Sequence, residues 1–182
     1  MKKIYSWLVV AMAVLTLGGC AARPIVDTVD QKEIDELAVA IQGLGEDVAP
    51  QEAARAADVA YRYSLQLAQE YQVTDPPLVH NAKVINGLRS RGLCNDWAED
   101  LNKRLKKERF STLAIHWAIS PPEPFRIIHH TAIISKVGDT IDDGIVLDPW
   151  RNSGALFWAP TKADKRYNWR PRMEVREELL KR

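Results

Sequence analysis

The chain has 182 residues, 46% of them hydrophobic, and a formal net charge of +1 at pH 7, values typical of one globular domain. Basic residues cluster between Lys103 and Arg109, but no aromatic side chains are interleaved with them, so they are interpreted as a solvated helix face and helix end. These properties exclude a nucleic-acid-binding protein and leave the oligomeric state open.

Residues 1–19 have the organisation of an export signal. Lys2-Lys3 precedes an apolar run over residues 4–17, which is shorter than the roughly 20 residues of a membrane-spanning helix. Loss of Lys2 and Lys3 from the 25 basic residues would leave 23 against 24 acidic ones, a net charge near zero.

The end of this signal, Leu17-Gly18-Gly19-Cys20, resembles the lipobox of bacterial lipoproteins. The resemblance implies cleavage before Cys20 and lipidation of Cys20 by acyl chains such as palmitate, which would hold the protein in the cell envelope. Ala21 after the cysteine is typical of sorting to the outer membrane, facing the periplasm. The alternative is an ordinary secretory signal in which the cysteine is incidental.

Residues 20–32 show no sustained apolar period and are predicted to be a tether, so the folded domain is predicted over 33–182. Helical periodicity and Gly or Pro punctuation predict three scaffold helices, over residues 33–44, 50–71 and 77–89. A fourth helix is predicted to start at Cys94, because Cys94, Trp97, Ala98, Leu101 and Leu105 share one helical face.

After Arg109 the sequence changes to short β-rich runs. The predicted strands are Ser111–Ile119, Arg126–Val137, Gly144–Leu147 and Ala155–Trp158, followed by a closing helix over Met173–Leu180. Helices first and strands later predict a single α+β domain, in which an antiparallel sheet packs against the helix that carries Cys94.

Cys94 is the candidate nucleophile. With Cys20 lipidated it has no disulfide partner, and a helix N-terminus and a neighbouring imidazolium both favour the thiolate form that cysteine chemistry requires. A histidine follows at His129-His130, at the start of an apolar strand, and Asp148 follows before Pro149, where it can orient a histidine. Each residue alone is more often structural, but the three in this order predict a thiol triad.

The two histidines lie on opposite faces of a strand, so one of them at most can face the thiol. His130 lies directly against the apolar run and is assigned as the catalytic base. His129 remains the alternative, because strand facing cannot be read from so apolar a segment.

Gly92-x-Cys94-Asn95-Asp96-Trp97-Ala98, the strand-initial histidine and Asp148-Pro149 together resemble the transglutaminase-like superfamily. This superfamily has a papain-like fold and includes bacterial cysteine peptidases. The resemblance covers residues 78–158 and implies the triad Cys94, His130 and Asp148. One departure is that Thr131 stands between His130 and Ala132, where the family has His-Ala.

The predicted function is therefore a membrane-anchored thiol hydrolase, a cysteine peptidase or amidase that forms a thioester. Its predicted partners are a peptide, protein or cell-wall amide as substrate and the membrane through the lipid anchor. The alternatives are a non-catalytic envelope lipoprotein that uses the same fold as a binding or assembly module, and, as a lesser variant, a protein-glutamine transglutaminase.

The sequence also makes predictions about the surroundings of the thiol. The backbone N–H of Cys94 is a candidate oxyanion donor, with Asn86, His80 or Trp97 as open choices for the second donor, and Trp150 is a candidate lid. No metal is expected, because His80 and His116 have no ligand partners at zinc-site spacing, and no cofactor is expected in the absence of nucleotide-binding loops.

Overall fold

The computed structural model describes residues 28–181. The predicted signal peptide, Cys20 and most of the tether lie outside the described residues. The domain is α+β, with five α-helices and one five-stranded antiparallel sheet among the described residues. The helices are α2 (Gln31–Gln42), α3 (Pro50–Glu70), α4 (Pro77–Ile85), α5 (Cys94–Lys106) and α6 (Arg172–Leu180).

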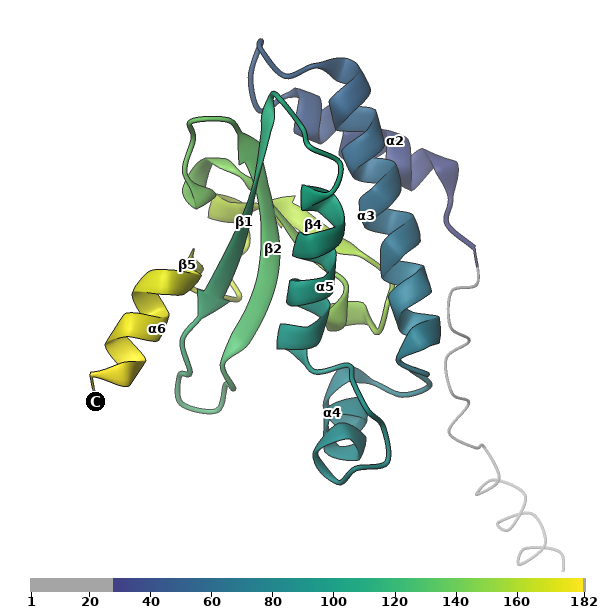
Figure 1. Ribbon diagram of the computed structural model, residues 1–182, viewed down its shortest axis with the longest axis vertical. Coiled ribbons are helices and arrows are strands. Elements are labelled where there is room, and N and C mark those ends of the chain that lie inside the picture. The colour runs from purple at the N-terminus through teal and green to yellow at the C-terminus, as the bar shows by residue number, and fades with distance from the viewer. Residues whose placement is uncertain (1–27, 182) are drawn as a thin grey trace, which may run out of the picture.

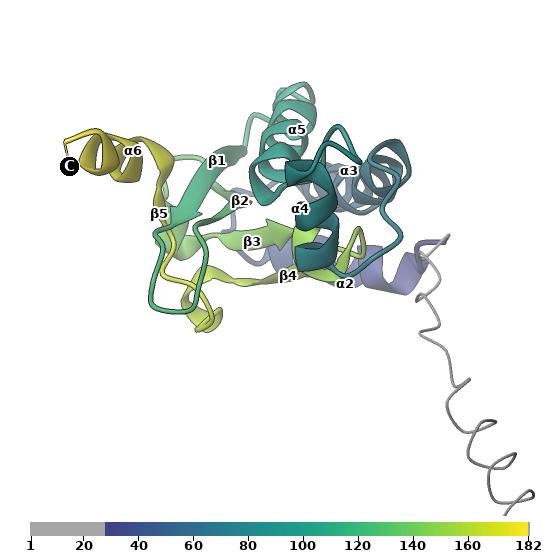
Figure 2. The ribbon, with the colours of Figure 1, turned by 90° about the horizontal axis from the view of Figure 1, so that it is seen from below.

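The strands are β1 (Leu113–Ser120), β2 (His129–Lys136), β3 (Ile145–Asp148), β4 (Phe157–Pro160) and β5 (Arg170–Pro171). They are arranged in the order β4-β3-β2-β1-β5, and every neighbouring pair is antiparallel. Helices α3 and α5 lie side by side along one face of the sheet, whereas α6 lies beside β5 at its edge (Figure 1 and Figure 2). The fold class predicted from the sequence is confirmed at this level.

Element boundaries differ from the predicted ones in a few places. Helix α2 begins at Gln31, inside the predicted tether, because the Asp30 carboxylate caps it by accepting a hydrogen bond from the Lys32 backbone N–H. Helix α4 ends at Ile85 rather than Arg89, since Gly87 has a φ of +74° and takes the chain out of the helix. The short β5 was not predicted.

Alternate residues of β2 and β3 pack into two different clusters. Ala132 and Leu147 join Leu101 of α5 in the larger core between the helices and the sheet. Ile133 and Val146 face the other side of the sheet and pack with Trp169 and its neighbours. The central strands are therefore buried on both faces, which explains their nearly continuous apolar sequence.

Glu52, in the first turn of α3, ties this helix to the start of β1. Its carboxylate accepts hydrogen bonds from the backbone N–H and the hydroxyl of Ser111 (2.8 and 2.9 Å) and of Thr112 (2.8 and 2.6 Å). Although burial raises the pKa of Glu52, these hydrogen bonds outweigh it and lower the pKa to about 2.

Glu52→Gln is expected to lower the free energy of unfolding by about 2 kcal/mol, because the amide N–H₂ meets donors instead of acceptors. In the wild type, the carboxylate contributes fully above its ordinary pKa of 4.5, and the contribution is lost as the pH falls towards 2. Urea unfolding at neutral pH measures the difference. The exposed Glu46→Gln is the control and should change stability by less than about 0.5 kcal/mol. Equal losses of stability in the two variants would show that the hydrogen bonds to Glu52 do not stabilise the fold.

Candidate functional site

The turn before α5 sets the position of Cys94. Gly92 has a φ of +121°, and a Cβ added there would lie 2.3 Å from Nε2 of His80, so only glycine fits. Trp97 Nε1 donates to the Gly92 carbonyl oxygen (3.0 Å), and the Asp96 carboxylate accepts from the backbone N–H groups of Gly92 (2.9 Å) and Leu93 (3.0 Å). The glycine, acid and aromatic of the motif therefore all build this turn.

Gly92→Ala is expected to destabilise the domain by about 3 kcal/mol, since it adds both backbone strain and a collision with the buried His80 ring. Gly87→Ala is the matched control: Gly87 also has a positive φ, +74°, but a Cβ there meets nothing within 4 Å. The control should cost about 1 kcal/mol by strain alone. Thermal unfolding of the two variants compares them, and equal losses would show that the contact with His80 is unimportant.

Cys94 is the first residue of α5 and is a buried, free thiol. Its side chain is held at the start of β2, where Sγ lies 3.7 Å from the Ile128 carbonyl oxygen. The first N–H groups of a helix have no intrahelical acceptor, so the helix presents partial positive charge beside the sulfur. The predicted location of Cys94 at a helix N-terminus is confirmed.

His129, not His130, pairs with Asp148. Nε2 of His129 lies 2.7 Å from Oδ2 of Asp148, and both side chains are only 1% exposed. The register pairs Ala132 with Leu147, which sets Thr131 opposite Asp148 one step further along. Residues two apart on a strand share a face, so His129 lies on the face of Asp148.

His130 points to the other face of β2, where its Nδ1 accepts a hydrogen bond from Trp117 Nε1 (3.1 Å). Burial, the nearby His129 and Arg172 lower the pKa of His130 to about 4, so it is neutral at pH 7. The assignment of His130 as the histidine beside Asp148 is therefore wrong, and the alternative, His129, occupies that place.

The pKa of His129 is shifted in the opposite direction. Burial alone lowers the pKa, but the charge and hydrogen bond of Asp148, with a further contribution from the Cys94 thiol, outweigh burial and raise it to about 9. His129 is thus an imidazolium at neutral pH. Its second ring nitrogen, Nδ1, is buried and accepts or donates no hydrogen bond among residues 28–181.

Three aromatic rings enclose His129. The ring centroids of Trp150, Tyr167 and Trp169 lie 4.7, 4.5 and 5.5 Å from that of His129. Trp150 is fixed in turn by a hydrogen bond from its Nε1 to Oδ1 of Asn81 in α4 (3.0 Å). Trp150 therefore covers the histidine as predicted for a lid, with Tyr167 and Trp169 completing the cover.

Among the three candidates for the second oxyanion donor, the side-chain N–H groups of Asn86 and Trp97 and the Nε2 atom of His80 are engaged elsewhere, whereas Nδ1 of His80 is buried without a hydrogen-bond partner among residues 28–181. Asn86 Nδ2 donates to the Ala82 carbonyl oxygen (2.7 Å), Trp97 Nε1 donates to Gly92, and His80 Nε2 lies 3.0 Å from the Arg91 carbonyl oxygen. None of them directs these groups towards Cys94. The backbone N–H of Cys94 remains the one predicted donor that the helix leaves without an intrahelical partner.

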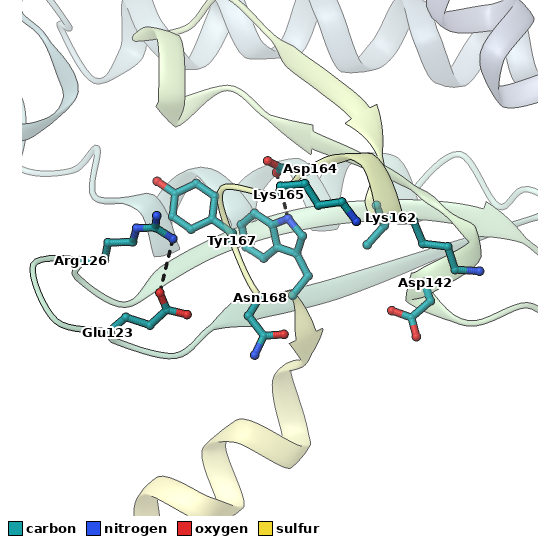
Figure 3. A pocket seen from close by; sticks show the side chains of 10 residues that line it. Glu123, Arg126, Asp142, Lys162, Asp164, Lys165, Tyr167 and Asn168 are labelled. Atoms are coloured by element: carbon teal, nitrogen blue, oxygen red, sulfur yellow. Dashed lines mark hydrogen bonds and ion pairs between the residues drawn. The ribbon is translucent and has the colours of Figure 1, made fainter.

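Access to the thiol is restricted. Cys94 is 6% exposed and His129 is fully buried. Two cavities on the described surface, of about 400 and 800 Å³, include neither residue in their lining. The smaller one is lined by Asp164, Tyr167 and Trp169 among others, so two rings of the aromatic cover form part of its wall (Figure 3). A substrate would therefore have to displace part of the cover.

The sequence did not reveal the residues that hold the carboxylate of the His129–Asp148 pair, chiefly Arg151 and Asp164. Arg151 Nε donates to Asp148 Oδ2 (3.1 Å) and its Nη2 donates to Asp164 Oδ2 (2.7 Å). The proximity of Arg151 to Asp148 in the sequence was a usable signal, because a turn after Asp148-Pro149 returns this side chain to the carboxylate. No pattern in the sequence points to Asp164.

No group of three His, Cys, Asp or Glu side chains suited to a metal ion occurs within residues 28–181. Over the same range, no helix has the length and apolar character needed to cross a membrane. Comparison with models of protein families, with curated proteins and with solved structures finds no match to this chain.

Proposed function

We propose that the protein is a thiol hydrolase of the cysteine peptidase or amidase class, with Cys94 as nucleophile, His129 as acid and base, and Asp148 as the group that orients His129. The observation that carries the proposal is the buried His129–Asp148 pair, 2.7 Å apart, together with a free thiol at a helix N-terminus that contributes to the raised pKa of His129. A nucleophile, a base and an orienting group within reach of one another are what covalent catalysis requires.

The reaction begins when the Cys94 thiolate attacks the carbonyl carbon of an amide and forms a C–S bond. The backbone N–H of Cys94 stabilises the oxyanion. The His129 imidazolium then gives its proton to the leaving nitrogen as the C–N bond breaks, which leaves a thioester. Water attacks this thioester, His129 accepts the water proton, and the C–S bond breaks to release the acid. Asp148 stabilises the charged ring in each step.

The resemblance to the papain-like, transglutaminase-like enzymes supports this proposal through the order of motifs and through the helix-start cysteine. Water is the expected acceptor of the acyl group, because no amine site is evident. We further propose the cell envelope as the location, with the anchor at Cys20, on the basis of the lipobox-like sequence alone.

The test uses the full chain in detergent with 4-nitrophenyl acetate, which acylates an activated thiol without the natural substrate. We expect a burst of 4-nitrophenolate, an acetyl group on Cys94 by peptide mass spectrometry, and slow hydrolytic turnover. Cys94→Ser should abolish the burst. A burst that survives in Cys94→Ser, or a wild-type thiol that reacts no faster than free cysteine, would contradict the proposal.

A second candidate function is a non-catalytic binding or assembly module of the cell envelope. It is favoured by one observation, the near-complete burial of Cys94 and His129 beneath aromatic rings. Complementation of a deletion strain separates the two functions. Full rescue by Cys94→Ser would indicate binding, whereas failure of this variant at wild-type abundance would indicate catalysis.

A further inference from the structure

Arg151 is buried against the carboxylate that holds His129. Its backbone N–H donates to Asp148 Oδ1 (3.2 Å), and its Nε donates to Oδ2 (3.1 Å), the same oxygen that faces His129. The Arg151 side chain is only 8% exposed. The carboxylate of Asp148 is therefore shared between two cationic groups.

The other side of the guanidinium meets a second carboxylate, that of Asp164. Nη1 donates to Oδ1 (3.2 Å) and Nη2 to Oδ2 (2.7 Å), a forked arrangement that fixes the plane of the guanidinium. Asp164 also accepts a hydrogen bond from Trp169 Nε1 (3.0 Å), and the Trp169 ring lies against His129. The contacts thus lead from His129 through Asp148, Arg151 and Asp164 to Trp169 and back to His129.

The charges of this closed set balance only when Asp164 is included. His129 as an imidazolium and Arg151 carry two positive charges, and Asp148 and Asp164 carry two negative ones. A buried charge without a partner is strongly unfavourable. Without Asp164, Arg151 would be balanced by Asp148 alone, and Asp148 would hold a proton on His129 less strongly.

We propose that Asp164 is a positioning residue of the site: it fixes Arg151 and offsets its charge, so that Asp148 can hold His129 as an oriented imidazolium beside Cys94. This inference rests on the proposed function for its catalytic meaning. Asp164 touches neither Cys94 nor a reacting atom, and it acts through Arg151 and Asp148. Figure 3 shows Asp164 at the wall of the smaller cavity, beside Tyr167.

The charged and titratable groups around His129 come from several elements. Asp148 faces it from β3 and Cys94 from α5, Tyr167 packs on its ring, and His130 follows it in β2. Asp148 is the carboxylate that contacts the ring. A change at Asp164 should therefore reach His129 through Asp148.

The test follows the ring protons of His129 by NMR during a pH titration of the full chain, with the signal assigned by its loss in His129→Gln. Asp164→Asn should lower the titration midpoint of His129 by at least about one pH unit, a tenfold change in its proton affinity. Asp164→Glu, which keeps the charge, should restore most of the shift. Asp143→Asn, at an exposed acid paired with Lys162, is the control and should leave the midpoint unchanged.

Arg151→Gln provides a second variant with an effect of opposite sign. It removes the competing cation and leaves both carboxylates, so the His129 midpoint should rise. An unchanged midpoint in Asp164→Asn together with a lower melting temperature would show a merely structural role and overturn the inference. If Asp164→Asn fails to fold, an unchanged or lower midpoint in Arg151→Gln overturns it instead.

The titration needs no turnover, so it separates this inference from the proposed function. If Cys94→Ser keeps the burst, the proposed function fails while the coupling between Asp164 and His129 can still be measured. If the burst depends on Cys94 and the midpoint does not respond to Asp164 or Arg151, the inference alone fails.

Discussion

His129→Ala is expected to slow acylation of Cys94 by 4-nitrophenyl acetate by about 10²- to 10⁴-fold at pH 7, whereas His130→Ala should change it by less than about threefold. The two residues are adjacent in β2, but only His129 is paired with Asp148 and charged at neutral pH. Removing it takes away both the imidazolium that favours the thiolate and the group that moves the proton. The size of the burst and its rate constant, measured in stopped flow, give the comparison.

The adjacent histidine makes this a demanding control, because both substitutions remove an imidazole ring from the same strand, buried at His129 and half-buried at His130. His130→Ala leaves the Trp117 indole N–H without its acceptor and should cost about 1 kcal/mol of stability. Equal losses of acylation in the two variants, with equal losses of stability, would show that the effect is structural. A loss confined to His130→Ala would return the role of base to that residue.

The sequence predicted the scaffold well because its signals are local. The helix face shared by Cys94 and Leu101, and the Pro and Gly residues between elements, can be read along the chain without knowing what packs where. The short β5, which contains only Arg170–Pro171, has no such pattern. Its two residues form a strand only because β1 offers them a partner.

The choice between His129 and His130 failed for a physical reason. The strand that follows them is buried on both faces, so hydrophobicity does not show which residues face which side. The facing is set by the register between β2 and β3, a property of two strands paired in space. The same limit applies to Asp164, which reaches Arg151 only after the chain has passed through β4.

The two faces of β2 also explain how adjacent histidines come to differ in charge. His129 is hydrogen-bonded to a carboxylate, and His130 lies against Trp117 with Arg172 nearby. A charge on His129 further disfavours a second charge on its neighbour. The pKa of His129 is thus raised, which favours its protonated form, and the pKa of His130 is lowered, which favours its neutral form.

Asp148→Asn is expected to reduce acylation of Cys94 by about 10²- to 10⁴-fold at pH 7, because burial then dominates and His129 loses its proton. It should also lower the free energy of unfolding in a pH-dependent way. In the wild type the pKa of His129 is raised from 6.5 to about 9, so the stabilisation from its proton is complete below pH 6.5 and is lost as the pH rises through 9. This contribution amounts to about 3 kcal/mol.

The variant lacks this contribution at every pH, so the stability difference from wild type should be smaller by about 3 kcal/mol well above pH 9 than at about pH 6.5. Arg151 also loses a partner in Asp148→Asn, but its guanidinium stays charged over this range, so that loss adds a constant offset. Urea unfolding at several pH values separates the pH-dependent loss at His129 from the constant loss at Arg151. A difference that is large but independent of pH would mean that Asp148 serves Arg151 alone and that His129 is not held as an imidazolium.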